Sequence, residues 1–143
     1  MKLFKQKGFT LIELLIVVAI IGVLATLLMA NFVGVRQRAR DAQRKADLKQ
    51  MQSALEMFRS DQNSYPTSAQ WPTCGNPLSV GSVVYMATVP CDPLSGWVYT
   101  YVPSGSGYTI YACLENGGDA QKDSTTNPTY CSGKAASYHV DNP

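Results

Sequence analysis

Residues 9–30 read FTLIELLIVVAIIGVLATLLMA, an apolar stretch in which Glu13 is the only charged residue. A helix crosses a bilayer with about 20 apolar residues, so this stretch is long enough to span a membrane once. A carboxylate within such a segment costs roughly 2.5 to 3.5 kcal/mol on insertion scales. This cost indicates that the carboxylate is present because it binds a partner. We therefore expect Glu13 to be functional. The alternative is a stray carboxylate whose side chain reaches the headgroups.

A short basic segment, residues 1–8, precedes the apolar stretch and ends in Gly8. Around this boundary, Lys7-Gly8-Phe9-Thr10-Leu11-Ile12-Glu13 resembles the processing site of type IV prepilins and type II secretion pseudopilins. The resemblance implies that a prepilin peptidase in the membrane cuts between Gly8 and Phe9 and methylates the new amino group of Phe9. Residues 1–8 are then a leader peptide and not a structural element. Because the apolar stretch follows the cut, the processed chain keeps its anchor.

The same resemblance implies the fold and the role of Glu13. Members of this family have a long N-terminal helix packed on a small antiparallel sheet, and they assemble into helical filaments through the apolar halves of their helices. The fold class expected here is therefore α+β, with disulfides in the sheet domain. In such a filament, the implied partner of Glu13 is the Phe9 amine of an adjacent subunit. This pair would neutralise both charges and set the axial register of incoming helices.

The first half of the chain is predicted to be one helix, because residues 9–61 contain no proline. At 1.5 Å per residue this helix is roughly 80 Å long, whereas a bilayer core takes about 30 Å of it. We expect residues 9–35 to form the membrane and assembly half, and residues 36–64 to form an amphipathic outer half. The helix should end before Pro66, which disfavours helical geometry in the residue before it. Residues 65–143 are expected to form a β-rich globular region.

The outer half of the helix carries two apolar faces. Large side chains recur at spacings of three and four, a stripe expected to pack on the globular region: Leu48, Met51, Leu55 and Phe58. Smaller side chains recur in the same way on the opposite side: Val35, Ala39, Ala42 and Ala46. Small side chains let helices approach closely, so this second face is interpreted as available to neighbouring helices in a bundle. A solvent-facing row of alanines is the alternative.

Beyond Pro66 the composition changes to Gly, Pro, Ser, Thr and aromatic residues, which is typical of strands and loops. We expect four short strands, at residues 83–86, 97–102, 108–113 and 137–140. The second and third should form a hairpin around the glycine-containing loop 103–107, and residues 116–127 should form a longer loop.

All four cysteines lie in the C-terminal half: Cys74, Cys91, Cys113 and Cys131. Their spacing matches no paired C-x-x-C metal site, and His139 is the chain's single histidine. An even cysteine count in a small domain beyond a membrane favours disulfides formed in an oxidising compartment, which places residues after about Val35 outside the cytoplasm. Four cysteines allow three pairings. We favour Cys74 with Cys91 and Cys113 with Cys131, because short loops close at the lowest entropic cost.

Basic residues flank the apolar stretch on both sides, so the positive-inside rule does not orient the chain. Beyond the stretch lies a basic cluster: Arg36, Arg38, Arg40, Arg44, Lys45 and Lys49. Asp41 and Lys45 stand at the spacing of a helical i,i+4 ion pair, so part of the charge is expected to be neutralised within the helix. The rest is interpreted as a solvated or lipid-adjacent face, and nucleic acid is the less favoured partner.

Hard oxygen ligands follow the predicted hairpin, and the family resemblance implies that a calcium ion can sit in this loop. The candidate ligands are Glu115, Asn116, Asp119 and Asp123. Such residues are also common in any solvated loop, and their spacing is not that of an EF-hand. No cofactor is therefore expected, with calcium as the alternative.

His139 has no matching nucleophile or paired carboxylates, so the chain is not predicted to be an enzyme.

Together these features predict a structural subunit of a type IV pilus or pseudopilus filament, serving adhesion, motility, DNA uptake or secretion. The expected partners are further copies of the chain, the prepilin peptidase and an assembly platform in the membrane. The precursor should be a single-pass protein of the cytoplasmic membrane, and the processed chain should lie in an extracellular or periplasmic filament. The alternative function is that of a minor pilin, an adhesin or DNA-binding component of such a filament.

Overall fold

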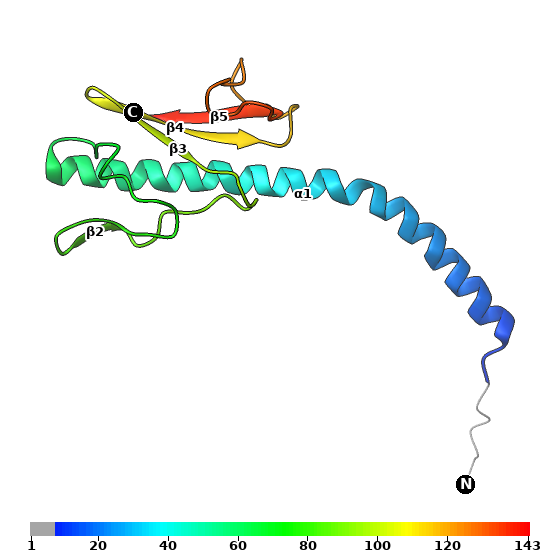
Figure 1. The fold of residues 1–143 in the computed structure, drawn as a ribbon. Coiled ribbons are helices and arrows are strands. Elements are labelled where there is room, and N and C mark those ends of the chain that lie inside the picture. Colours follow the sequence, from blue (N-terminus) through cyan, green and yellow to red (C-terminus); the bar gives the residue numbers. More distant parts are fainter. Residues whose placement is uncertain (1–7) are drawn as a thin grey trace, which may run out of the picture. The chain divides into compact units, whose positions relative to one another are not determined.

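The structure is a computed structural model that describes residues 8–143. The chain divides into two compact units, Met1–Arg36 and Gln37–Pro143, called unit 1 and unit 2 below. Helix α1 (Leu11–Gln62) contributes to both units, and all the strands belong to unit 2 (Figure 1). The α+β class expected from the sequence is therefore confirmed. Most of the predicted leader, residues 1–7, lies outside the described residues.

Helix α1 ends where the sequence predicts. Asn63 follows the last helical residue with a φ of 55°, the left-handed conformation that commonly closes a helix and that Asn tolerates. Its amide still donates to the carbonyl of Arg59 at 2.8 Å. Tyr65 and Pro66 then carry the chain away from the helix, and both residues are buried.

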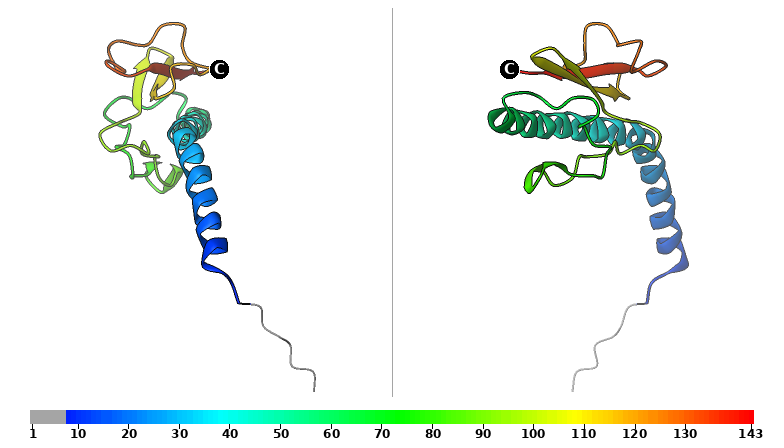
Figure 2. Two further views of the ribbon diagram at one scale, coloured as in Figure 1. Left: turned by 90° about the vertical axis from the view of Figure 1, so that its right-hand side faces the viewer. Right: turned by 60° about the vertical axis from the view of Figure 1, so that its left-hand side comes forward.

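Unit 2 contains two small antiparallel sheets. Strands β1 (Leu78–Val80) and β2 (Val83–Met86) form a two-stranded hairpin. Strands β3 (Thr100–Ser104), β4 (Gly107–Leu114) and β5 (Ala136–Asp141) form a three-stranded sheet in the order β3-β4-β5. Within unit 2 the three-stranded sheet lies on one side of α1 and the two-stranded hairpin on another, as the views of Figures 1 and 2 agree.

The β3–β4 hairpin differs from the prediction in two ways. Its first strand begins at Thr100 and not at Trp97, and its connection is shorter than the predicted loop 103–107, because Ser104 pairs directly with Gly107. Gly105 supplies the positive φ, 54°, that such a two-residue turn requires. Pro103 stays within β3, since an edge strand needs no amide donor on its outer side. The strands predicted at residues 83–86 and 137–140 are observed, whereas β1 was not anticipated.

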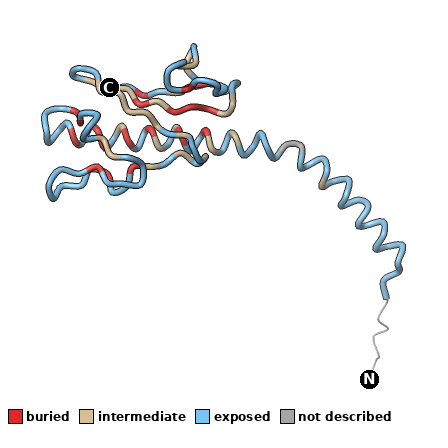
Figure 3. Tube along the Cα trace, viewed as in Figure 1, coloured by how far each residue is buried: buried red, intermediate tan, exposed pale blue. Residues whose placement is uncertain are grey.

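The core of unit 2 lies along one side of α1. The predicted stripe of large side chains is confirmed, since Leu48, Met51, Leu55 and Phe58 are all fully buried or nearly so. Figure 3 shows that buried positions, in red, recur along the part of α1 that belongs to unit 2. Aromatic side chains from the loops and strands complete this core, among them Tyr65, Tyr85 and Tyr108. The smaller face, Val35, Ala39, Ala42 and Ala46, is exposed.

Two disulfides connect the loops of unit 2, with the pairing favoured from the sequence. Cys74–Cys91 links the segment before β1 to the segment after β2, and Cys113–Cys131 links β4 to the long loop that leads to β5. Both close short loops, with sequence separations of 17 and 18 residues. Part of unit 2 therefore consists of irregular chain that is attached covalently to its neighbours.

Candidate functional site

Two groups of residues stand out as candidates for function. The first, called the N-terminal segment, comprises residues 8–13 and contains the sequence-predicted Gly8, Phe9 and Glu13. The second, called the ion cluster, joins Arg40, Asp41, Arg44, Asp92 and Glu115 in unit 2. The N-terminal segment was predicted from the sequence, but the ion cluster was not.

The N-terminal segment caps helix α1. The Thr10 hydroxyl accepts the amide of Glu13 at 3.3 Å, and the Glu13 carboxylate accepts the amide of Thr10 at 2.8 Å and its hydroxyl at 2.7 Å. This reciprocal arrangement is a capping box, which satisfies amides that have no partner inside the helix. Glu13 therefore has a local structural role in the single chain, and sequence reasoning had not recognised its spacing of three from Thr10.

Gly8 and Phe9 precede the helix, and the other described residues leave both of them unconstrained. A Cβ atom added to Gly8 would meet nothing within 4 Å, and Phe9 is 88% exposed. The bond between these two residues is thus accessible in the chain. A larger side chain at residue 8 would not disturb this chain's own structure.

The apolar part of unit 1 is not covered by the protein. Leu11–Met29 is long and apolar enough to span a membrane, and no part of this window is buried within the protein. Large side chains along it, including Leu15, Ile20 and Leu27, are more than half exposed. An exposed apolar surface of this size is typical of a segment that contacts a membrane or another protein.

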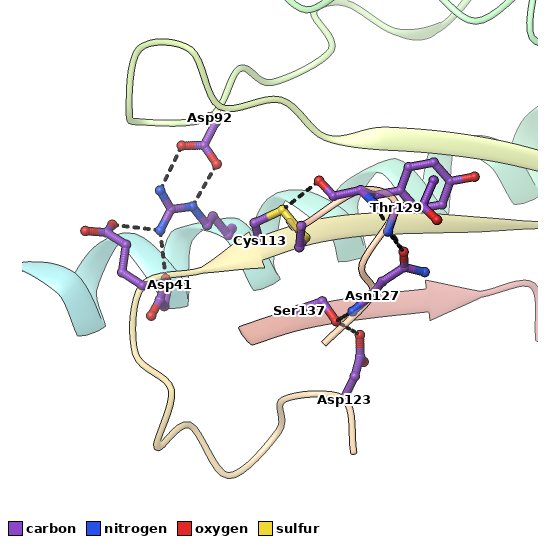
Figure 4. Close-up of a disulfide and its surroundings, with 11 residues drawn as sticks. Asp41, Asp92, Cys113, Asp123, Asn127, Thr129 and Ser137 are labelled. Carbon is purple, nitrogen blue, oxygen red and sulfur yellow. Dashed lines mark hydrogen bonds and ion pairs between the residues drawn. A yellow bond between two sulfur atoms is a disulfide. The ribbon is translucent and has the colours of Figure 1, made fainter. Parts of the chain in front are cut away.

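Arg44 is the centre of the ion cluster, and its side chain is fully buried. Its guanidinium binds Asp92 through two bonds, with Nε at 2.7 Å and Nη2 at 2.8 Å from the carboxylate oxygens. The remaining nitrogen, Nη1, donates to Asp41 at 2.7 Å and to Glu115 at 2.8 Å. Figure 4 shows Asp41 on α1 and Asp92 on a loop, both joined by hydrogen bonds to the guanidinium between them. Burial lowers the pKa of Arg44, but the bonds to these carboxylates outweigh it and raise the pKa.

The rest of the ion cluster attaches the segment after β4 to the helix. Arg40 binds Glu115 through Nε at 2.7 Å and Nη2 at 2.6 Å. Asp41 accepts the backbone amides of Glu115 and Asn116 at 3.0 and 2.8 Å. Arg44 Cζ also lies 4.6 Å from the centroid of the Trp97 ring, a cation–π contact. The cluster thus fixes three separate segments of unit 2 relative to each other.

The basic cluster predicted from the sequence is therefore not a uniformly solvated face. Arg40, Arg44 and Lys45 form ion pairs with carboxylates of unit 2. The expected pair between Asp41 and Lys45 is wrong, because Asp41 binds Arg44 and Lys45 binds Asp119. Local spacing cannot decide such a competition when carboxylates from distant segments reach the same helix face. Arg36, Arg38 and Lys49 remain exposed.

A sequence signal for the ion cluster existed and was missed. Asp41 and Arg44 continue the spacing of the buried stripe that begins at Leu48, so both lie in register with core positions. A charged residue in such a register is buried only when it is paired. Its partners are invisible to local patterns, because Asp92 and Glu115 lie 48 and 71 residues from Arg44 in the chain.

The ion cluster predicts a loss of stability in acid. The hydrogen bond from Arg40 is the largest effect that lowers the pKa of Glu115, which falls from 4.5 to about 2. Because the folded-state pKa is depressed, the ionised carboxylate stabilises unit 2 above about pH 4.5, and this contribution is lost as the pH falls towards 2. Melting temperatures of the full chain in detergent should therefore drop through this window.

A Glu115→Gln variant isolates this contribution. It should melt lower than the unchanged protein at pH 6 and should show a smaller decrease between pH 4.5 and about 2. An Asp61→Asn variant, altered at an exposed carboxylate of α1, is the matched control and should keep the original profile. If the melting temperatures of Glu115→Gln and the unchanged protein depend on pH in the same way, ionised Glu115 does not stabilise unit 2.

Two protein-family models match the chain, and together they span both groups of residues. Residues 3–29 match the prokaryotic N-terminal methylation motif, a range that contains Gly8, Phe9 and Glu13. Residues 31–131 match the model of type II secretion system protein G, which covers the ion cluster. The chain belongs to the type II secretion system protein G family.

Three relatives within the protein G family align with the chain over more than three quarters of their own length. The type II secretion system core protein G of Escherichia coli K12 is 33% identical over 138 residues, covering 86% of this chain and 91% of the relative. That of Vibrio cholerae is 34% identical over 116 residues, covering 76% and 79%. That of Pseudomonas aeruginosa is 32% identical over 130 residues, covering 83% and 90%. No solved structure matches the chain at a significant level.

Proposed function

We propose that the processed chain is a structural subunit of a helical filament of the type IV pilus or pseudopilus class. Membership of the protein G family supports this proposal, because the relatives are named as core proteins of a type II secretion system. The function is then mechanical and not enzymatic. Secretion is the favoured purpose of the filament, ahead of adhesion, motility or DNA uptake.

The observation that carries this proposal is the uncovered apolar helix that begins directly after the accessible Gly8–Phe9 bond. Leu11–Met29 is long and apolar enough to span a bilayer, which supports a precursor anchored in the cytoplasmic membrane. Other copies of the same segment offer an equally apolar environment. Transfer from the bilayer to a bundle of such helices is therefore possible without exposing this surface to water.

Glu13 is proposed to select which helices move from the bilayer into the bundle. The cut after Gly8 creates an amino group on Phe9, and the carboxylate of Glu13 in a neighbouring subunit is the complementary charge. In the single chain this carboxylate is held by Thr10. Capping keeps the side chain near the helix start, where an incoming amine would meet it. The implied partners are thus further copies of the chain, the prepilin peptidase and a membrane assembly platform.

The same geometry is compatible with a minor pilin, which would be incorporated in small numbers and carry a binding function. The DNA-binding version of this alternative rests on the basic cluster. Three of its members are engaged by carboxylates of unit 2, namely Arg40, Arg44 and Lys45. This leaves less positive charge for phosphate contacts, so the structural subunit is favoured.

Processing provides the direct test of the proposal. When the precursor is produced together with a prepilin peptidase, intact-mass analysis should show a chain that begins at Phe9 and carries one methyl group. A Gly8→Leu variant should remain uncut. Since a Cβ atom at residue 8 meets nothing within 4 Å, this loss would reflect the peptidase and not misfolding.

A Gly22→Ala variant is the matched control, because a Cβ atom there also meets nothing within 4 Å. It should be cut normally, and both variants should retain the two disulfides. A wild-type chain that keeps Met1 in the presence of active peptidase would overturn the proposal. Efficient cutting of Gly8→Leu would remove the assigned role of Gly8.

A further inference from the structure

The loop that follows β4, residues 115–123, contains the four candidate calcium ligands named from the sequence. We propose that cations of the protein itself hold this loop, with Lys45 as the main one, and that unit 2 folds and keeps this loop ordered without calcium. Unit 2 would fold in this way whether or not the chain assembles into filaments.

Lys45 occupies the position of a cation for Asp119. Its ammonium group lies 3.0 and 2.8 Å from the two carboxylate oxygens of Asp119 and 3.1 Å from the side-chain oxygen of Gln121. Both side chains of the ion pair are largely buried, at 19% and 14% exposed. The hydrogen bond from Lys45 is the largest effect that lowers the pKa of Asp119. The ammonium group of Lys45 thus binds three side-chain oxygens of the loop, as a bound metal ion would.

Glu115 and Asn116 are directed to other partners. Both oxygens of Glu115 bind arginine side chains, Arg40 on each oxygen and Arg44 on one. The side-chain oxygen of Asn116 accepts the amide of Gly118 at 3.1 Å. To use Glu115, a calcium ion would have to compete with Arg40, which binds both carboxylate oxygens, and with the buried Arg44, which binds one. Displacing either arginine leaves uncompensated positive charge beside the new ion.

Asp123 is also engaged, on the opposite side of the loop. One of its carboxylate oxygens accepts the hydroxyl of Ser137, and the other lies 2.6 Å from Nδ1 of His139. Figure 4 shows Asp123 beside Ser137 on β5, away from Asp41 and Asp92. Asp123 therefore attaches the end of the loop to β5, while Lys45 attaches its middle to α1.

The four candidates consequently do not form a calcium site. Calcium takes six to eight oxygen ligands around one point, usually with two or more carboxylates. Across residues 8–143, no group of three or more His, Cys, Asp or Glu side chains is arranged to hold a metal ion. Each candidate carboxylate already accepts hydrogen bonds from a positively charged or polar protein donor. The donor set fits a loop fixed by ion pairs and not one fixed by a metal.

The direct test compares the melting temperature of the full chain in detergent with excess chelator and with calcium. About 5 mM calcium would largely fill even a weak extracellular site. Such binding would raise the melting temperature of a domain of this size by about 4 °C or more. We expect a change below about 1 °C, and no saturable heat when calcium is titrated into the protein. A rise of several degrees, or a saturable titration, would overturn the inference.

A pair of lysine variants tests whether Lys45 holds the loop. Lys45→Met keeps the length of the side chain but removes its charge. Lys49→Met makes the same change at an exposed lysine whose ammonium group donates to the neutral side chain of Gln52. We expect Lys45→Met to lower the melting temperature by about 4 °C and Lys49→Met to leave it unchanged. Equal melting temperatures for the two variants would contradict the role of Lys45.

Amide exchange locates the effect within the chain. The amide of Gln121 donates to the Asp119 carboxylate at 2.8 Å, so its exchange reports whether that carboxylate is still held. In Lys45→Met it should exchange about tenfold faster than in Lys49→Met, because the loop opens locally. Unchanged exchange at Gln121 in Lys45→Met would show that Lys45 does not order the loop.

Discussion

Replacing Arg44 with methionine is expected to lower the free energy of unfolding by about 3 to 5 kcal/mol, the range for breaking a buried ion pair from one side. Among residues 8–143, Arg44 is the one cation that forms an ion pair with Asp92, and the substitution removes it. The Asp41 and Asp92 side chains are each 1% exposed. The substitution also leaves Glu115 with a single arginine. Urea denaturation of the full chain in detergent, followed by circular dichroism, measures the change.

Two further variants show whether the lower free energy of unfolding arises from the buried carboxylates left unpaired by Arg44→Met. Arg38→Met alters an exposed arginine of the same helix, for which no ion pair occurs within residues 8–143, and should cost no more than about 0.5 kcal/mol. Combining Arg44→Met with Asp41→Asn and Asp92→Asn removes the buried charges together and should recover part of the stability. If Arg44→Met is as stable as Arg38→Met, the ion cluster does not hold unit 2 together.

The second large effect is expected on assembly, when Glu13 is replaced with glutamine. Gln at this position still accepts the amide of Thr10, so the capping box is retained. Its neutral side chain cannot form the ion pair that we propose between Glu13 and the Phe9 amine of a neighbouring subunit. Loss of one charge-assisted hydrogen bond of about 1.5 to 3 kcal/mol weakens each association step by roughly 10- to 100-fold. Filament yield in sheared surface fractions should fall accordingly, while processing at Gly8 and the fold of unit 2 remain normal.

Variants at neighbouring positions separate the charge of Glu13 from its capping role. Thr10→Val removes the hydroxyl that binds Glu13 but keeps the carboxylate. It should cost about 1 kcal/mol at the start of the helix and reduce assembly less than Glu13→Gln does. Leu14→Ala is the control for a side chain that is 58% exposed in the single chain and should have a much smaller effect. Normal filaments from Glu13→Gln together with failed assembly of Thr10→Val would assign Glu13 to capping alone.

The elements that the sequence predicted correctly depend on local patterns. Helix α1 follows from an uninterrupted run without proline, and its buried stripe follows from spacings of three and four around Leu48 and Met51. The disulfide pairing follows from the low entropic cost of short loops. The hairpin boundaries at Pro103 and Gly105 were wrong, because the edge position that permits proline in β3 is a property of the sheet and not of the segment.

By itself, the sequence determined that this protein has a helix of membrane-spanning length, and it predicted a processing site at Gly8–Phe9 and a C-terminal region closed by disulfides. Those features depend on composition and on residues close together in the chain, where geometry is almost fixed by spacing. Only the tertiary structure decided which charges of α1 are buried, since Arg44 and Lys45 are neutralised by carboxylates more than 40 residues away. The same spacing of charges would also suit a helix whose charged side chains are all solvated. These side chains form an internal ion cluster because carboxylates from distant segments replace water as their partners.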